Sequence, residues 1–121
     1  MTSELQTQDW YTSLVDECKA IIVERVYNSN FELITGYCEV GERITEDENY
    51  KKYGKGNQRF NKELFDAIGI GKTTGYYCLQ SYQVKIKPIL DEGKAKYVST
   101  AVETSINKNT SWTKFKQELP Q

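Results

Sequence analysis

The chain has 121 residues, of which 38% are hydrophobic and 27% charged, and this composition is typical of a single folded domain covering residues 1–121. Histidine is absent, which excludes the usual general base and the Ser/His and Cys/His nucleophile pairs. The sequence has no run of about 18 apolar residues and no signal-peptide pattern, so we expect a cytoplasmic protein without membrane contact.

The net charge of −1 hides a strong division along the chain. Residues 1–50 carry eleven acidic and three basic side chains, a balance of −8, whereas residues 51–87 carry two acidic and eight basic ones, a balance of +6. Such asymmetry favours a polyanion as the partner of the middle segment. Two solvated faces that neutralise each other would give the same pattern, so charge alone leaves both explanations open.

Three cysteines, Cys18, Cys38 and Cys78, are spaced far apart, and no neighbouring Cys or His completes a zinc site. We expect them to be buried thiols in a reducing cytosol, and we expect no metal and no cofactor.

The first helical region spans about residues 8–48, where apolar residues recur at intervals of three and four. The pattern predicts one long helix or two helices, with a break at Asn28, Ser29 and Asn30. Acidic residues 46–48 would be unfavourable at a helix C-terminus, so the helix should end before them.

The centre of the chain begins with a glycine-punctuated basic loop over residues 51–59. A helix is expected over residues 61–68 with Asn61 as its N-cap, and glycines at 69 and 71 should separate it from a helix running from Lys72 past Tyr82. Pro88 should stop that helix or begin the next element.

Residues 89–106 predict a further helix, interrupted or kinked at Gly93, although residues 97–100 have strand-like composition. A short last helix, capped by Thr110 or Ser111, should present Trp112, Phe115 and Leu119 on one apolar face. The sequence therefore predicts an all-α fold of about five helices, with a long first helix.

Residues 60–84 have the pattern of a helix-turn-helix, because apolar Ile68 and Ile70 flank the turn residue Gly69 and apolar residues recur at Cys78 and Leu79. The second helix would read the major groove of DNA. The residues expected to face the groove are Lys72, Thr73, Tyr76, Tyr77 and Gln80. The residues expected to hold phosphates from the preceding loop are Lys51, Lys52, Lys55 and Arg59.

One feature weakens this prediction: Gly75 stands where a branched apolar residue normally locks the two helices together, and an interior glycine costs about 1 kcal/mol relative to alanine. A helical hairpin with its tyrosines in the core and no nucleic-acid ligand would also fit the sequence.

Two short stretches match catalytic motifs only in part. Gly71, Lys72 and Thr73 resemble the end of a phosphate-binding loop, but Asp66 stands where that loop needs a glycine, and the lead-in has helical spacing. Glu92-Gly93-Lys94 matches half of a metal-dependent nuclease site, but no convincing strand precedes it to carry the partner carboxylate.

The order of several short phrases resembles the amino-terminal helical domain of the YhcG-like proteins. These phrases are GYCEVGERI (36–44), YGKG (53–56), CLQSY (78–82) and SWTKF (111–115). Family members often continue into a PD-(D/E)XK-type nuclease domain, for which this chain has no room. The resemblance implies a DNA-binding or assembly role without nuclease activity.

We therefore expect a non-enzymatic module that binds double-stranded DNA. A homodimer would suit DNA with two half-sites. We expect the protein to be an accessory protein of a mobile element or a nuclease system. The alternative is a protein-interaction module whose acidic first helix docks on a partner around Trp10.

Overall fold

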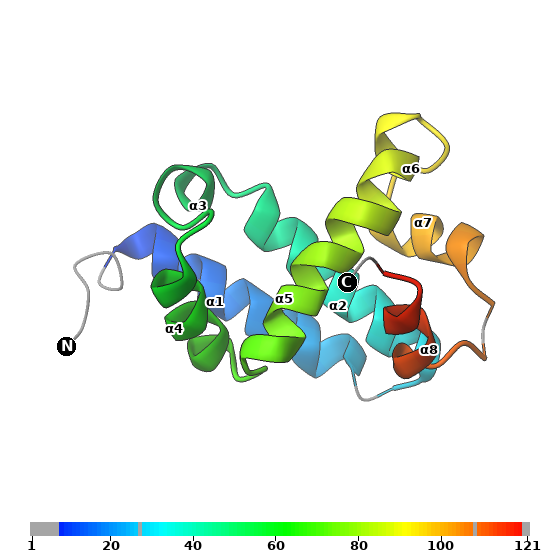
Figure 1. Cartoon of the computed structure of the whole chain (residues 1–121), viewed down its shortest axis with the longest axis horizontal. Coiled ribbons are helices and arrows are strands. Elements are labelled where there is room, and N and C mark those ends of the chain that lie inside the picture. Colours follow the sequence, from blue (N-terminus) through cyan, green and yellow to red (C-terminus); the bar gives the residue numbers. More distant parts are fainter. Residues whose placement is uncertain (1–7, 27, 108, 120–121) are drawn as a thin grey trace.

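The computed structural model describes residues 8–26, 28–107 and 109–119, and all regular secondary structure in them is helical. The all-α prediction is confirmed, although the chain has more helices than the five expected (Figure 1). The elements are α1 (Asp9–Ile21), the π-helical η2 (Ile22–Val26), α2 (Asn30–Thr45), α3 (Glu48–Tyr53), α4 (Gln58–Ile68), α5 (Lys72–Gln80), the π-helical η3 (Ser81–Ile86), α6 (Lys87–Asp91), α7 (Val98–Ser105) and α8 (Trp112–Gln117).

The first helical region is two helices, and the break lies where the sequence predicted it. α1 continues through η2 to Val26, and α2 starts at Asn30. The Ser29 side chain caps α2 by accepting a hydrogen bond from the Glu32 N–H at 3.1 Å. α2 ends at Thr45, before the acidic residues, as the helix dipole requires.

The basic loop expected over residues 51–59 is mostly helical, which corrects the sequence prediction. The Asp47 carboxylate accepts from the Tyr50 N–H at 2.9 Å and so starts α3. An acid that is unfavourable at the end of α2 is thus favourable at the start of α3, where the dipole has the opposite sign. Only residues 54–57 remain as a connection.

Asn61 is not the N-cap of α4. The helix starts one turn earlier, because the Asn57 side chain accepts from the Phe60 N–H at 3.0 Å. Asn61 lies inside the helix and is buried, and its side-chain oxygen accepts a hydrogen bond from the Tyr50 hydroxyl at 2.7 Å. The residue expected to cap α4 instead makes a buried polar contact between α3 and α4.

Pro88 does not interrupt the helix, because α5, η3 and α6 follow one another from Lys72 to Asp91. Of the two predicted alternatives, the second is confirmed: Pro88 begins the next element, because it lies in the first turn of α6. The preceding Lys87 N–H donates to the Tyr82 carbonyl, five residues earlier, as in a π-helix. The helix expected over 89–106 is divided in two by an exposed turn at Gly93, and the strand-like residues 97–100 lead into α7.

Two apolar clusters form the interior, and α2 contributes to both. The first joins α2 to α1, α3, α4 and α5, and the second joins α2 to η3, α7 and α8. In Figure 1, α5 crosses in front of α2. A Cβ on Gly41 of α2 would lie 2.1 Å from the Cys78 carbonyl oxygen of α5, so the two backbones touch only because position 41 has no side chain.

Gly75, which the sequence suggested would weaken the helix-turn-helix, is where α5 packs against α4. A Cβ there would lie 2.2 Å from Cγ of the fully buried Phe65 ring. The aromatic ring fills the space that a branched side chain normally occupies between the two helices.

We predict that Gly75→Ala destabilises the protein by about 1–3 kcal/mol, because the new methyl group clashes with the Phe65 ring. The free-energy cost of this clash exceeds the gain in helix propensity from glycine to alanine. Thermal or urea unfolding measures the change. Thr74→Ala, one residue away and only half-buried, is the control and should change stability by no more than about 0.5 kcal/mol. Equal stability of Gly75→Ala and wild type would contradict the packing described.

Candidate nucleic-acid interface

The turn between α4 and α5 is built by two glycines with positive φ, Gly69 at 94° and Gly71 at 78°. The N–H groups of Gly69 and Ile70 both donate to the Phe65 carbonyl, at 2.9 and 3.2 Å, which closes the end of α4. Gly71 then begins α5. Since a helix rather than a strand leads into Gly71 and Lys72, the local structure differs from a phosphate-binding loop.

Tyr76 of α5 is fixed by contacts with α4. Its ring meets the Phe65 ring edge to face at 5.2 Å between centroids, and its hydroxyl lies 3.5 Å from the Asn61 side-chain nitrogen. Because Asn61 also accepts from Tyr50, a polar chain of Tyr50, Asn61 and Tyr76 links α3, α4 and α5. Burial raises the pKa of Tyr50, so its hydroxyl stays protonated and can donate to Asn61.

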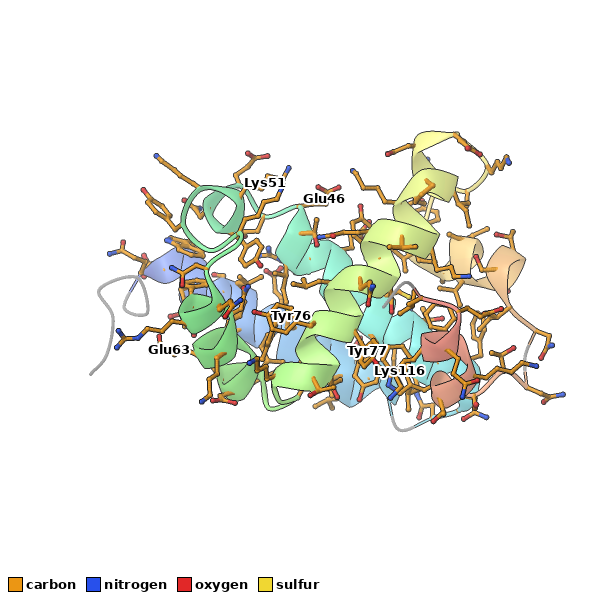
Figure 2. All side chains as sticks on the ribbon, in the orientation of Figure 1. Glu46, Lys51, Glu63, Tyr76, Tyr77 and Lys116 are labelled. Carbon is orange, nitrogen blue, oxygen red and sulfur yellow. The ribbon has the colours of Figure 1, made fainter. Side chains whose placement is uncertain are left out.

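A concavity of about 760 Å³ opens beside this polar chain, and we call it the basic groove. Four lysines from separate elements line it: Lys51 of α3, Lys55 of the following connection, Lys72 of α5 and Lys87 of α6. The other lining residues are Thr45, Glu46, Tyr50, Gly56, Gln58, Asn61, Tyr76, Leu79 and Gln83. In Figure 2, Lys51 and Tyr76 lie on the side of α5 that faces α3 and α4.

Four of the nine residues predicted from the sequence line the groove: Lys51, Lys55, Lys72 and Tyr76. The other five do not. Thr73 is exposed on the first turn of α5, Gln80 is half-buried farther along, and Tyr77 packs against α8.

The remaining two predicted residues, Lys52 and Arg59, are exposed outside the groove. The Lys52 ammonium lies 5.3 Å from the centre of the Tyr53 ring, and the Arg59 guanidinium lies 3.8 Å from Glu63. Both residues lie on helices, Lys52 on α3 and Arg59 on α4, and not in the flexible loop that was expected. Their side chains therefore do not line the groove.

Sequence reasoning missed Gln83 and Lys87. Both continue a stripe of groove residues along one helix face, at positions 72, 76, 79, 83 and 87. This three- and four-residue spacing was visible in the sequence. The boundary expected at Pro88, as the stop of one helix or the start of the next, divided this face.

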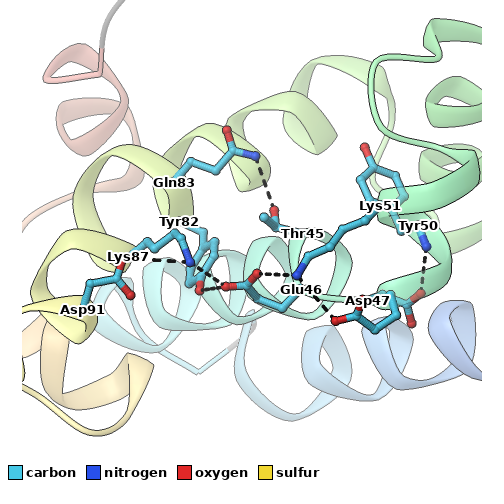
Figure 3. Close-up of polar contacts among 10 residues, drawn as sticks. Thr45, Glu46, Asp47, Tyr50, Lys51, Tyr82, Gln83, Lys87 and Asp91 are labelled. Carbon is cyan, nitrogen blue, oxygen red and sulfur yellow. Dashed lines mark hydrogen bonds and ion pairs between the residues drawn. The ribbon is translucent and has the colours of Figure 1, made fainter.

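Glu46 is the single acid among the groove-lining residues, and it holds two of the lysines (Figure 3). Its carboxylate lies 2.9 Å from the Lys87 ammonium and 3.4 Å from the Lys51 ammonium, and it accepts from the Tyr82 hydroxyl at 2.8 Å. The hydrogen bonds from Lys87 and Tyr82 lower the pKa of Glu46 to about 2. Glu46 is therefore ionised and offsets part of the positive charge.

Lys55 and Lys72 form no ion pair with any residue that the structure describes. Both are exposed, so they can neutralise an external anion without first breaking an internal contact. They are the groove lysines best placed to bind one.

The acidic first third of the chain is partly neutralised by its own arginines. Arg25 pairs with Glu32 at 2.7 Å and Glu39 at 2.5 Å, which joins η2 to α2. Arg43 pairs with Asp47 at 2.7 Å and donates to Glu17 at 2.8 Å, which joins α2 to α1. These acids act as structural partners between the first helices.

The three cysteines are buried free thiols, as the sequence predicted. Burial raises the pKa of Cys18 to about 12, and it also raises the pKa of Cys38 and of Cys78. Thiolate is the nucleophilic form, so these residues have little reactivity near neutral pH.

The half-motif Glu92-Gly93-Lys94 lies on an exposed turn after α6, where Glu92 and Lys94 pair with each other at 2.9 Å. Within the described residues, no group of three or more Cys, Asp or Glu side chains is arranged to hold a metal ion.

Comparisons with protein-family models, with curated proteins and with solved structures found no match for this chain. The resemblance to the YhcG-like proteins therefore stays a prediction from the sequence. Across the part of the chain that the structure describes, no helix combines the length and apolar character needed to cross a bilayer.

We predict that Glu46 makes the stability of the protein depend on pH in the acid range. The unfolded-state pKa is about 4.3 and the folded-state pKa about 2, so ionised Glu46 stabilises the fold above about pH 4.3, and this stabilisation is lost as the pH falls towards 2. The difference in melting temperature between wild type and Glu46→Gln should shrink over that range.

Tyr82→Phe removes one of the hydrogen bonds to Glu46 and should reduce the pH dependence only in part. A difference in melting temperature that stays constant from about pH 5 to about pH 2 would show that Glu46 is not held in this way.

Proposed function

We propose that this protein binds double-stranded DNA, with the lysines of the basic groove on phosphates and the outward face of α5 towards the major groove. The observation that carries the proposal is the convergence of Lys51, Lys55, Lys72 and Lys87 on one concavity, although they come from separate elements. Lysines on a folded surface that neutralise phosphates supply most of the affinity for a duplex, and they do so without sequence preference.

The groove also offers groups that can hydrogen-bond to bases or sugars. Gln58 and Gln83 have side-chain amides that donate and accept, and the Tyr76 hydroxyl lies at the groove wall. Gln58 begins α4, Tyr76 lies on the second turn of α5, and Gln83 lies in η3, which continues α5. Phosphate contacts would position the protein, and these polar groups would supply any preference for sequence.

Protein docking around Trp10 has less support. Trp10 is only partly exposed, and its ring stacks with Tyr53 and Phe60 at 6.1 Å between centroids in each case. Trp10 is therefore a packing residue that joins α1 to α3 and α4, and its replacement would test folding rather than docking.

Dimerisation, a cytoplasmic location and a role beside a mobile element or a nuclease remain predictions from the sequence.

The test is the salt dependence of duplex binding, measured by fluorescence anisotropy with wild type and with the double variant Lys55→Gln/Lys72→Gln. Each lysine lost from a phosphate should lower the slope of log affinity against log salt by about 1, so the double variant should lower it by about 2 and bind more weakly.

The control double variant is Lys62→Gln/Lys94→Gln, which removes the same charge from two exposed lysines that pair with Asp66 and Glu92 outside the groove. It should keep the wild-type slope. Absence of duplex binding by the wild type even at low salt, or equal losses in both double variants, would refute the proposal.

A further inference from the structure

α8 lies against α5 on the side away from the basic groove. Tyr76 and Tyr77 follow each other in sequence but lie on opposite sides of α5, and Lys116 of α8 lies beside Tyr77 (Figure 2). The Lys116 ammonium is 5.0 Å from the centre of the Tyr77 ring and 5.7 Å from that of the Trp112 ring. A cation is thus held at the edge of α5 by two aromatic faces.

The position of α8 is fixed by packing and by its cap. Ser111 caps the helix by accepting from the Lys114 N–H at 3.1 Å, and Phe115 is fully buried. The Trp112 ring stacks on Phe115 at 5.9 Å and meets Tyr37 at 4.8 Å between centroids. These contacts hold the backbone of Lys114 and Lys116 in place relative to α5.

Lys114 is exposed and has no ion-pair partner among the described residues. Residues 88–121 have a charge balance of only +1, so composition does not predict a basic surface in this part of the chain. Two of its lysines lie on the short helix α8, which packs beside α5 through the contact of Trp112 with Tyr77.

A helix that lies in the major groove of a duplex has a phosphate strand on each side of it, about 12 Å apart across the groove. The basic groove provides cations on one side of α5, and α8 lies at the other side, with Lys116 held over the Tyr77 ring and Lys114 exposed to solvent. We propose that Lys114 and Lys116 form a second phosphate-binding rim, which contacts the opposite DNA strand when α5 lies in the major groove.

This inference rests on the proposed function and narrows the ligand to double-helical DNA. A single strand can follow the basic groove alone, because its phosphates need cations on only one side of α5. A duplex engages both rims at once. The second rim should therefore contribute to duplex binding and contribute little to single-strand binding.

The experiment measures the salt dependence of binding to a duplex and to one of its single strands, with the full chain and the double variant Lys114→Gln/Lys116→Gln. On the duplex, the slope of log affinity against log salt should fall by about 2 relative to wild type, and on the single strand it should not change. Lys114→Gln alone should lower the duplex slope by about 1, which keeps the test valid if loss of Lys116 disturbs its aromatic contacts.

The matched control is Lys94→Gln/Lys96→Gln, because it removes the same charge and Lys96 also lies over an aromatic ring, that of Tyr97, at 5.8 Å. It should keep both slopes. Groove-dependent duplex binding with an unchanged slope in the Lys114/Lys116 variant would overturn the second rim and leave the proposed function standing. An equal fall on duplex and single strand would overturn the duplex geometry, and no binding by wild type would refute both proposals.

Discussion

The architecture depends on the close approach of α5 to two other helices at glycines that leave no room for a side chain. Gly41 lets the α2 backbone reach the Cys78 carbonyl of α5, and Gly75 lets α5 settle on the Phe65 ring of α4. With both contacts made, the rotation of α5 about its axis is set. That rotation sends Tyr76 towards the basic groove and Tyr77 towards α8. The position of every proposed DNA contact on α5 follows from it.

Charge is organised around this helical frame rather than along the sequence. Acids of the first third pair with Arg25 and Arg43, which bind the first helices together. Glu46 instead lines the basic groove and pairs with Lys51 and Lys87. The groove therefore combines two lysines paired with Glu46 and two, Lys55 and Lys72, that have no ion-pair partner in the described part of the chain. An anion in the groove can pair directly with Lys55 and Lys72, whereas the negative charge of Glu46 weakens its attraction to Lys51 and Lys87.

Local signals in the sequence predicted the helical class, the break at Ser29, the turn at Gly69 and the apolar residues Trp112 and Phe115 of the last helix, because caps, glycines and periodicity act within a few residues. Leu119, expected on the same helix face, is buried but lies beyond the end of α8. The same signals failed where a contact with another helix decided the outcome. Asn61 has the sequence features of a cap, but its side chain accepts a hydrogen bond from Tyr50 of α3. Gly75 looked like a defect because its partner, Phe65, is ten positions away in sequence. The sites of Lys87 and Lys116 depend on how helices cross, which no short motif encodes.

The most direct test of the account is a map of backbone amide chemical shifts in the isotope-labelled protein, recorded with and without a duplex at low salt. Because the turn at Gly69 and the contact at Gly75 place α3, the connection after it and α5 around one groove, residues 51–58 and 72–83 should shift together as the duplex is added. Shifts confined to α1 and α7, or spread evenly over the surface, would contradict the claim that this groove and α5 form the interface.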